Sequence, residues 1–312
     1  MKSTRLRRRK FLKTDEEIAI AEPFNRLNDA YFKSVMASSE RKHITIAFLN
    51  AVMSHVYSDG HPEIDDVEFL DREVVSVWEG AKVPRFDVFL RAIFKDRDLE
   101  AKLCHIEVQD AKDKFFMKRG FFYACHDYAG QSRRGLDYED FEPIVFVGLL
   151  NFRLDDRAEN QSEWYNLHRV LNNATHECSI GLMELHMTEL SLLRQKWRKF
   201  KHEPSTKFEE LMFYFGGVGG KNMGNTVVQE IAERNPVVAE LLDYEQRFRM
   251  DPLLMRQYVM AERAHIDYLA NLEYEREEGR IEVAHNLRVK GIMTDEEIAQ
   301  VAGIPVEVVR GL

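Results

Sequence analysis

Two β-prone, largely apolar segments carry polar side chains that such segments seldom hold. Asp87 interrupts the first segment, and Glu107 and Gln109 interrupt the second. A polar turn at residues 95–100 separates them, as is typical of a β-hairpin. Side chains alternate across a strand, so Glu107 and Gln109 share one face. If the two segments pair, Asp87 lies opposite Glu107.

Opposed carboxylates could share a hard divalent cation. Mg²⁺ and Mn²⁺ prefer oxygen ligands, and the backbone carbonyl of Val108 is a further possible ligand. A cation held in this way can neutralise a phosphate and activate a water, which is the chemistry of phosphodiester hydrolysis. The spacing alone is weak support, because a solvent-facing strand edge with acidic and amide side chains has the same pattern.

The segments around these residues predict a mixed α/β core over residues 15–155. Helices are expected at 15–36 and 41–57, and a further helix at 112–133 should end before Gly135. The almost wholly apolar run at 143–150 predicts a strand buried on both faces of a sheet. The other predicted strands are at 67–77, 85–95 and 101–110.

The second half of the chain has mainly helical periodicity and predicts a helical extension over residues 156–290. Its expected helices are at 159–173, 184–201, 206–215, 225–234, 236–245 and 251–290. The last residues, 291–312, predict a hairpin of two helices around Gly303, with a capping box at Thr294. This hairpin is acidic, so packing or self-association is favoured over reading a DNA groove.

Composition limits the class of protein. The chain of 312 residues has a formal net charge of −9, which disfavours a protein that coats nucleic acid. Its positive charge is nevertheless clustered at 2–13, 112–134 and 194–201. The basic tail at 1–14 has no apolar core and no run reaches the length of a membrane span, so we expect a cytoplasmic protein that does not enter a membrane. Three cysteines without CxxC spacing predict neither a disulfide framework nor a zinc site.

Several short motifs occur together in a characteristic order. With them, the chain resembles the PD-(D/E)XK nuclease family transposases, also described as recombination-promoting nucleases, from about residue 24 to its end. The matching positions are Asp29-Ala-Tyr-Phe-Lys33, Ile46-Ala-Phe-Leu-Asn50, Lys82, Phe86-Asp-Val88, Ile106-Glu-Val-Gln109, Arg119, Tyr123, Tyr128, Gln131, Gly135, Tyr138, Thr294-Asp-Glu-Glu-Ile-Ala299 and Gly303.

This resemblance implies a restriction-endonuclease-like fold, in which helices flank a mixed sheet and a mostly helical extension follows. It makes Asp87 and Glu107 the motif acids, and it implies that Asp29 completes the metal site with them and Val108. Gln109 stands where most of the wider superfamily has lysine. It can orient a water but lacks positive charge, so another cation is needed. The remaining candidates are Lys33 and Lys82 as catalytic cations, and Lys114, Lys118, Arg119 and Tyr123 as DNA-binding residues, with a bracing role open for the last two.

The leading hypothesis is an Mg²⁺-dependent DNA endonuclease in which Mn²⁺ can substitute, acting in recombination, mobile-element transfer or defence against foreign DNA. A homodimer is expected, because a one-site enzyme needs two copies or two events to cut both strands. The alternative is a weak or inactive DNA-binding or regulatory protein on a nuclease fold. Gln109, in place of the lysine of most of the superfamily, favours this alternative. A purely helical scaffold leaves the polar side chains of the first-half strands unexplained.

Overall fold

The computed structural model describes residues 14–21, 24–57, 60–71, 87–134, 137–154, 163–178, 180–200, 203–217 and 220–312. Contacts divide the chain into two compact units. The larger contains Ile20–Tyr258, and the smaller contains Val259–Leu312 with the short helix α2 (Asp15–Ala19). The predicted basic tail, apart from Thr14, and Lys82 lie outside the described residues.

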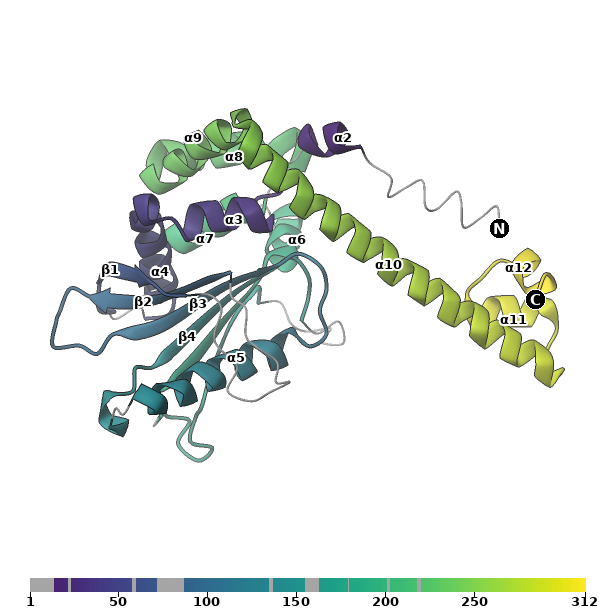
Figure 1. The fold of residues 1–312 in the computed structure, drawn as a ribbon, viewed down its shortest axis with the longest axis horizontal. Coiled ribbons are helices and arrows are strands. Elements are labelled where there is room, and N and C mark those ends of the chain that lie inside the picture. Colours follow the sequence, from purple (N-terminus) through teal and green to yellow (C-terminus); the bar gives the residue numbers. More distant parts are fainter. Residues whose placement is uncertain are drawn as a thin grey trace. The chain divides into compact units, whose positions relative to one another are not determined.

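A six-stranded mixed sheet is the framework of the larger unit (Figure 1). The strand order is β1-β2-β3-β4-β6-β5. β1, β2 and β3 pair antiparallel, β3, β4 and β6 pair parallel, and β5 pairs antiparallel with β6. The strands are β1 (Ile64–Phe69), β2 (Val88–Phe94), β3 (Lys102–Gln109), β4 (Ile144–Leu150), β5 (Tyr165–Arg169) and β6 (Met183–Glu189).

Helices cover both faces of this sheet, and Figure 1 shows α5 on the face opposite α3, α4 and α7. Every residue of β4 is buried, as its apolar sequence predicts. The rings of Phe116 and Phe146 join α5 to β4, and Gly120 leaves room for the Phe146 ring. The helices and 3-10 turns of this unit are α3 (Asp29–Met36), η1 (Ser39–Arg41), α4 (Lys42–Val56), α5 (Phe116–Gly130), η2 (Gln131–Arg134), η3 (Tyr138–Asp140), α6 (Leu190–Phe200), α7 (Lys207–Phe215), α8 (Gly220–Arg234) and α9 (Pro236–Met250).

Two predicted helices are wrong, because the segments at 159–173 and 184–201 contribute β5 and β6 to the sheet. Only the second half of the latter segment is helical, as α6. β6 contains Glu, Leu and Met, which favour helices, but six of its seven residues are buried between α-helices and neighbouring strands. Tertiary burial overrides the local preference. The sheet therefore continues past residue 155, and the predicted extension at 156–290 is not purely helical.

The predicted first helix, 15–36, is also interrupted, since α2 and α3 are separate helices. The Asn28 side chain caps α3 by accepting hydrogen bonds from the backbone N–H groups of Ala30 and Tyr31. Of the predicted strand at 67–77, β1 covers only the beginning, and residues 72–77 lie outside the described part.

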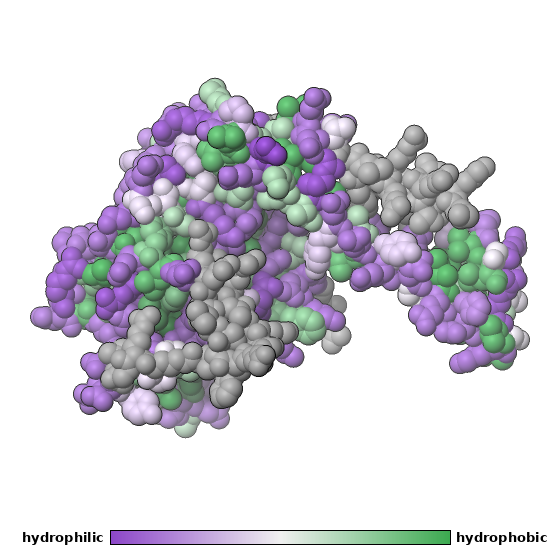
Figure 2. Space-filling view, in the orientation of Figure 1, coloured by the Kyte–Doolittle hydropathy of each residue, from purple (hydrophilic) through white to green (hydrophobic). Residues whose placement is uncertain are grey.

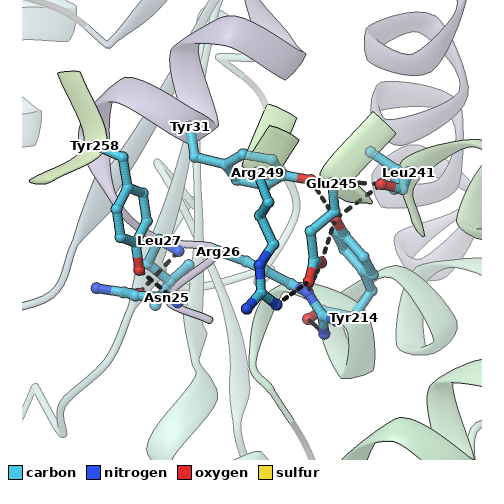
Figure 3. Close-up of polar contacts among 9 residues, drawn as sticks. All are labelled: Asn25, Arg26, Leu27, Tyr31, Tyr214, Leu241, Glu245, Arg249 and Tyr258. Carbon is cyan, nitrogen blue, oxygen red and sulfur yellow. Dashed lines mark hydrogen bonds and ion pairs between the residues drawn. The ribbon is translucent and has the colours of Figure 1, made fainter. Parts of the chain in front are cut away.

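A buried polar network ties the residues before α3 to α7 and α9 (Figure 3). The Arg26 Nε–H donates to Glu245 Oε2 at 2.7 Å, and an Nη1–H donates to the Tyr214 carbonyl at 2.9 Å. The Tyr31 and Tyr214 hydroxyls are hydrogen bonded, and Tyr214 also donates to Glu245. The network holds α3 in place.

The C-terminal hairpin has the predicted helix, Gly turn, helix form. It consists of α11 (Asp295–Ala302) and α12 (Val306–Arg310), with a capping box at Thr294 and Gly303 in the left-handed conformation at φ 64°. It follows α10 (Pro252–Lys290) and packs a small core of Ala284, Ile298, Ala302 and Val309. At the right of Figure 2, apolar groups of this hairpin lie among hydrophilic ones. Among the described helices, none is both long and apolar enough to cross a membrane.

Candidate active site

The hairpin of β2 and β3 places the two motif acids opposite each other. Val88 pairs with Ile106, so Asp87 and Glu107 follow at the next register position. The Asp87 backbone N–H donates to Glu107 Oε1 at 2.9 Å, and the Val108 N–H donates to Asp87 Oδ2 at 2.9 Å. Each carboxylate is thus held by the backbone of the other strand, as expected from pairing through the 95–100 turn.

α3 adds an acid and an ammonium to this pair. The Lys33 Nζ lies 2.5 Å from Asp29 Oδ1 and 3.1 Å from Asp87 Oδ1. Asp29 and Lys33 are four residues apart and therefore share one helical face. The Tyr31 and Phe32 side chains of this helix are fully buried and fix it against the core. Lys33 thereby links the helix to the strand acid.

Burial works against the charge of both strand acids. It raises the pKa of Asp87 to about 6, although the Lys33 ammonium and the Val108 N–H favour the carboxylate. Burial also raises the pKa of Glu107 well above its ordinary value, and the neighbouring Asp87 raises it further, while the Asp87 N–H, Arg119 and Lys33 oppose this. Glu107 is only 5% exposed. The site concentrates negative charge where water solvates it poorly.

The Gln109 side chain is held by the Arg119 guanidinium, a contact that the sequence pattern does not predict. The Arg119 Nη2–H donates to Gln109 Oε1 at 2.7 Å, and Arg119 Nη1 lies 2.5 Å from Asp113 Oδ2. The Gln109 Nε2–H donates to the Ala111 carbonyl at 3.1 Å. Arg119, proposed from sequence as a DNA contact or a brace, here positions Gln109 and supplies positive charge beside it.

The donor set fits a divalent cation bound by few protein ligands. Among the described residues, no three His, Cys, Asp or Glu side chains are grouped to hold a metal ion. Mg²⁺, however, is usually held by one or two carboxylates together with waters and substrate phosphates. Asp87 and Glu107 offer two hard oxygen donors and surplus negative charge. Asp29 contacts Lys33 and also interacts with Asp87. Its role as a third ligand stays a prediction, as does that of the Val108 carbonyl.

The other predicted DNA-binding residues lie on or just before α5. Lys114 and Lys118 are exposed, whereas Tyr123 is half-buried and packs against the cluster around Phe116 and Phe146, which favours its bracing role. His105 and His126 both approach Asp127, at 2.9 and 3.2 Å. Neither histidine belongs to a group of three or more His, Cys, Asp or Glu side chains that could hold a metal ion among the described residues.

A network of polar side chains around Asp110 lies close in sequence to Gln109, and it is not among the features predicted from the sequence. Asp110, which follows β3, accepts hydrogen bonds from the side chains of Asn25 and Asn151. Asn151 follows β4 and accepts from Arg194 of α6. Acidic and amide residues directly after two neighbouring parallel strands are the signal that could have located it, because such strand ends meet at one sheet edge.

Comparison with known proteins identifies one family. The model of the PD-(D/E)XK nuclease family transposases matches residues 26–275, most of the chain. Searches of curated proteins and of solved structures find no match. The matched region contains Asp29, Asp87, Glu107 and Gln109, and it also includes β5 and β6, for which the sequence pattern predicts helices.

Proposed function

Because the chain belongs to the PD-(D/E)XK nuclease family transposases, we propose that it is a divalent-metal-dependent endonuclease that hydrolyses phosphodiester bonds of DNA. The observation that carries this proposal is a pair of carboxylates, the buried Glu107 and the part-buried Asp87, held opposite each other by backbone N–H groups. Paired like charges with raised pKa values are costly in a fold unless they serve to bind a cation or a proton. Mg²⁺ is the expected ion, with Mn²⁺ able to substitute.

Each side chain has a defined part in this proposal. Asp87 and Glu107 hold the cation, with Asp29 and the Val108 carbonyl as further ligands. The bound cation supplies charge neutralisation on the phosphate and activation of the attacking water. The Gln109 amide orients that water, while the positive charges of Lys33 and Arg119 stabilise negative charge that develops on the phosphate. Lys82 stays a candidate for a further catalytic cation.

The first test is cleavage of supercoiled plasmid with Mg²⁺, with Mn²⁺ and with EDTA. We expect nicking or linearisation with either metal and none with EDTA. Mg²⁺ should also raise the melting temperature of the wild-type protein, because a ligand that binds only the folded state stabilises it. The Glu107→Gln variant should lose both responses. Cleavage that persists in EDTA, or a Glu107→Gln variant that retains both responses, would remove the basis of the proposal.

Arg119 should matter for the rate because it is the guanidinium beside Gln109. Replacing Arg119 with Met should lower kcat by roughly 10²-fold, the usual effect of removing one electrostatic group from an active site. Arg119→Lys should recover part of this loss. Lys118→Met is the matched control on the same helix, and we expect it to weaken DNA binding while kcat is retained. A higher KM with unchanged kcat in Arg119→Met, as expected for Lys118→Met, would show that Arg119 acts only through DNA affinity.

The second candidate is a weak or inactive DNA-binding regulator on the same fold, favoured by Gln109 in place of lysine. The plasmid assay separates the two candidates, because the regulator binds DNA without metal-dependent cutting. The endonuclease would act in recombination, mobile-element transfer or defence against foreign DNA. Its partner is DNA, and we expect a homodimer in which two sites cut the two strands.

A further inference from the structure

The outer face of α5 displays aromatic rings that the fold does not use. Phe121 and Phe122 are 53% and 43% exposed, and Phe115, just before the helix, is 54% exposed. The inner face, with Phe116, packs against the sheet and accounts for the helix's place in the core. Burying a phenyl ring stabilises a fold more than burying most other side chains does. Three exposed rings on one short segment therefore indicate a binding surface.

Lysines alternate with these rings. Lys114 and Lys118 are exposed, and the Lys114 ammonium lies 4.8 Å from the centroid of the Phe115 ring. The Lys118 side chain lies at the surface, so its ammonium can approach a ligand. Lys118 and Phe122 are four residues apart and neighbours on one helical face. The surface thus offers aromatic faces and positive charge side by side.

The helix that carries this surface also reaches the candidate active site. α5 starts seven residues after β3 ends, and Arg119 in its first turns donates to Gln109. Phe115 and Phe122 are separated by about 10 Å along the helix, given a rise of ~1.5 Å per residue. A chain of nucleotides lying along α5 would therefore reach the carboxylates at the helix's N-terminal end.

We propose that the outer face of α5, formed by Phe115, Lys118, Phe121 and Phe122, is a stacking platform for single-stranded DNA, so that the strand entering the active site is unpaired. This inference rests on the proposed nuclease function and names its substrate. In single-stranded DNA the base faces are open and can stack on phenyl rings while lysines contact the phosphates. In duplex DNA the base faces are covered by neighbouring pairs, and the rings would have nothing to stack on.

The test is binding of a fluorescent oligonucleotide, single-stranded and as a duplex, in EDTA so that no cleavage occurs. Wild type should bind the single strand more tightly. The Phe121→Ala/Phe122→Ala double variant should lose at least about tenfold in affinity for the single strand, with less than about twofold change for the duplex. Tyr138→Ala is the matched control, because Tyr138 is an aromatic residue, 87% exposed, outside α5. We expect it to bind as wild type does.

Three outcomes overturn the platform. In the first, the double variant loses affinity equally for single-stranded and duplex DNA. In the second, it loses no affinity for either. In the third, light scattering shows that the double variant loses an oligomer while single-strand binding stays intact, which would make the surface an interface between protein copies. The nuclease proposal is judged separately by the plasmid assay. Metal-dependent cutting with unchanged single-strand binding in the double variant would refute the platform alone. Single-strand binding that needs the rings, without any cutting, would support the platform and refute the nuclease.

Discussion

Replacing Asp87 with Asn should abolish metal-dependent DNA cleavage, with a loss of at least about 10³-fold in rate. The substitution keeps the size of the side chain and an oxygen that can accept from the Val108 N–H. It removes the negative charge that, with Glu107, would hold the cation. Without the cation's activation of water and neutralisation of charge, the activation free energy should rise by several kcal/mol. Each ~1.4 kcal/mol lowers the rate about tenfold. The readout is the initial rate of plasmid nicking with Mg²⁺.

The same substitution should stabilise the metal-free protein at neutral pH. Burial raises the folded-state pKa of Asp87 from 3.8 to about 6. The Asp87 carboxyl therefore binds a proton more tightly in the folded protein than in the unfolded chain. Its protonation adds to the free energy of unfolding at low pH, and this contribution is lost as pH rises from about 4 to about 6. A shift of this size corresponds to roughly 3 kcal/mol. Urea unfolding in EDTA should show Asp87→Asn and wild type nearly equal at pH 4 and the variant more stable at pH 8.

Asp87→Asn should therefore lower the cleavage rate while it raises the free energy of unfolding at neutral pH. A misfolded variant would lose both, so the two measurements distinguish a loss of the site from misfolding. Asp65→Asn is the matched control, because Asp65 lies on β1 with a half-exposed side chain paired to Arg97. It should leave the cleavage rate unchanged. An Asp87→Asn variant that cuts DNA at more than a tenth of the wild-type rate would place the catalytic acid elsewhere.

Arg26→Met should be the most destabilising single change in the buried polar network of Figure 3. The Arg26–Glu245 pair is almost fully buried, with side-chain exposures of 9% and 10%. The guanidinium also lies 4.2 Å from the centroid of the Tyr214 ring. Removing it leaves the Glu245 carboxylate without its closest cation, and breaking a buried pair in this way costs about 3–5 kcal/mol. Urea unfolding at pH 7 measures the loss.

Two further variants test that reason. Arg249→Met removes the second cation near Glu245, which is more exposed at 32% and lies 3.9 Å away, so its cost should stay below about 1 kcal/mol. Arg26→Met combined with Glu245→Leu should recover much of the stability, because no buried charge then lacks a partner. Equal losses in the single and double variants would mean that packing against Tyr214, rather than charge, sets the stability.

Local patterns were sufficient for the hairpin of the motif acids and for several elements around it. Alternation along two adjacent strands and a short turn between them predict Asp87 opposite Glu107, and both requirements lie within about 25 residues. The buried strand β4 and the C-terminal hairpin followed from an apolar run and from the capping box with Gly303. The family match supports the fold that the ordered motifs implied.

Long-range packing decided the remainder. β5 and β6 are strands because neighbouring strands and helices enclose them, whereas their own residues also suit a helix. Arg119 meets Gln109 only because α5 folds back on the sheet, and Arg26 meets Glu245 across 219 residues of sequence. The raised pKa values of Asp87 and Glu107 depend on burial. The pairing of Asp87 with Glu107 can be predicted from sequence, since the two strands and their turn are adjacent in the chain. How strongly the two acids resist ionisation, and which cation lies beside Gln109, cannot be predicted in this way, because both depend on contacts between distant segments.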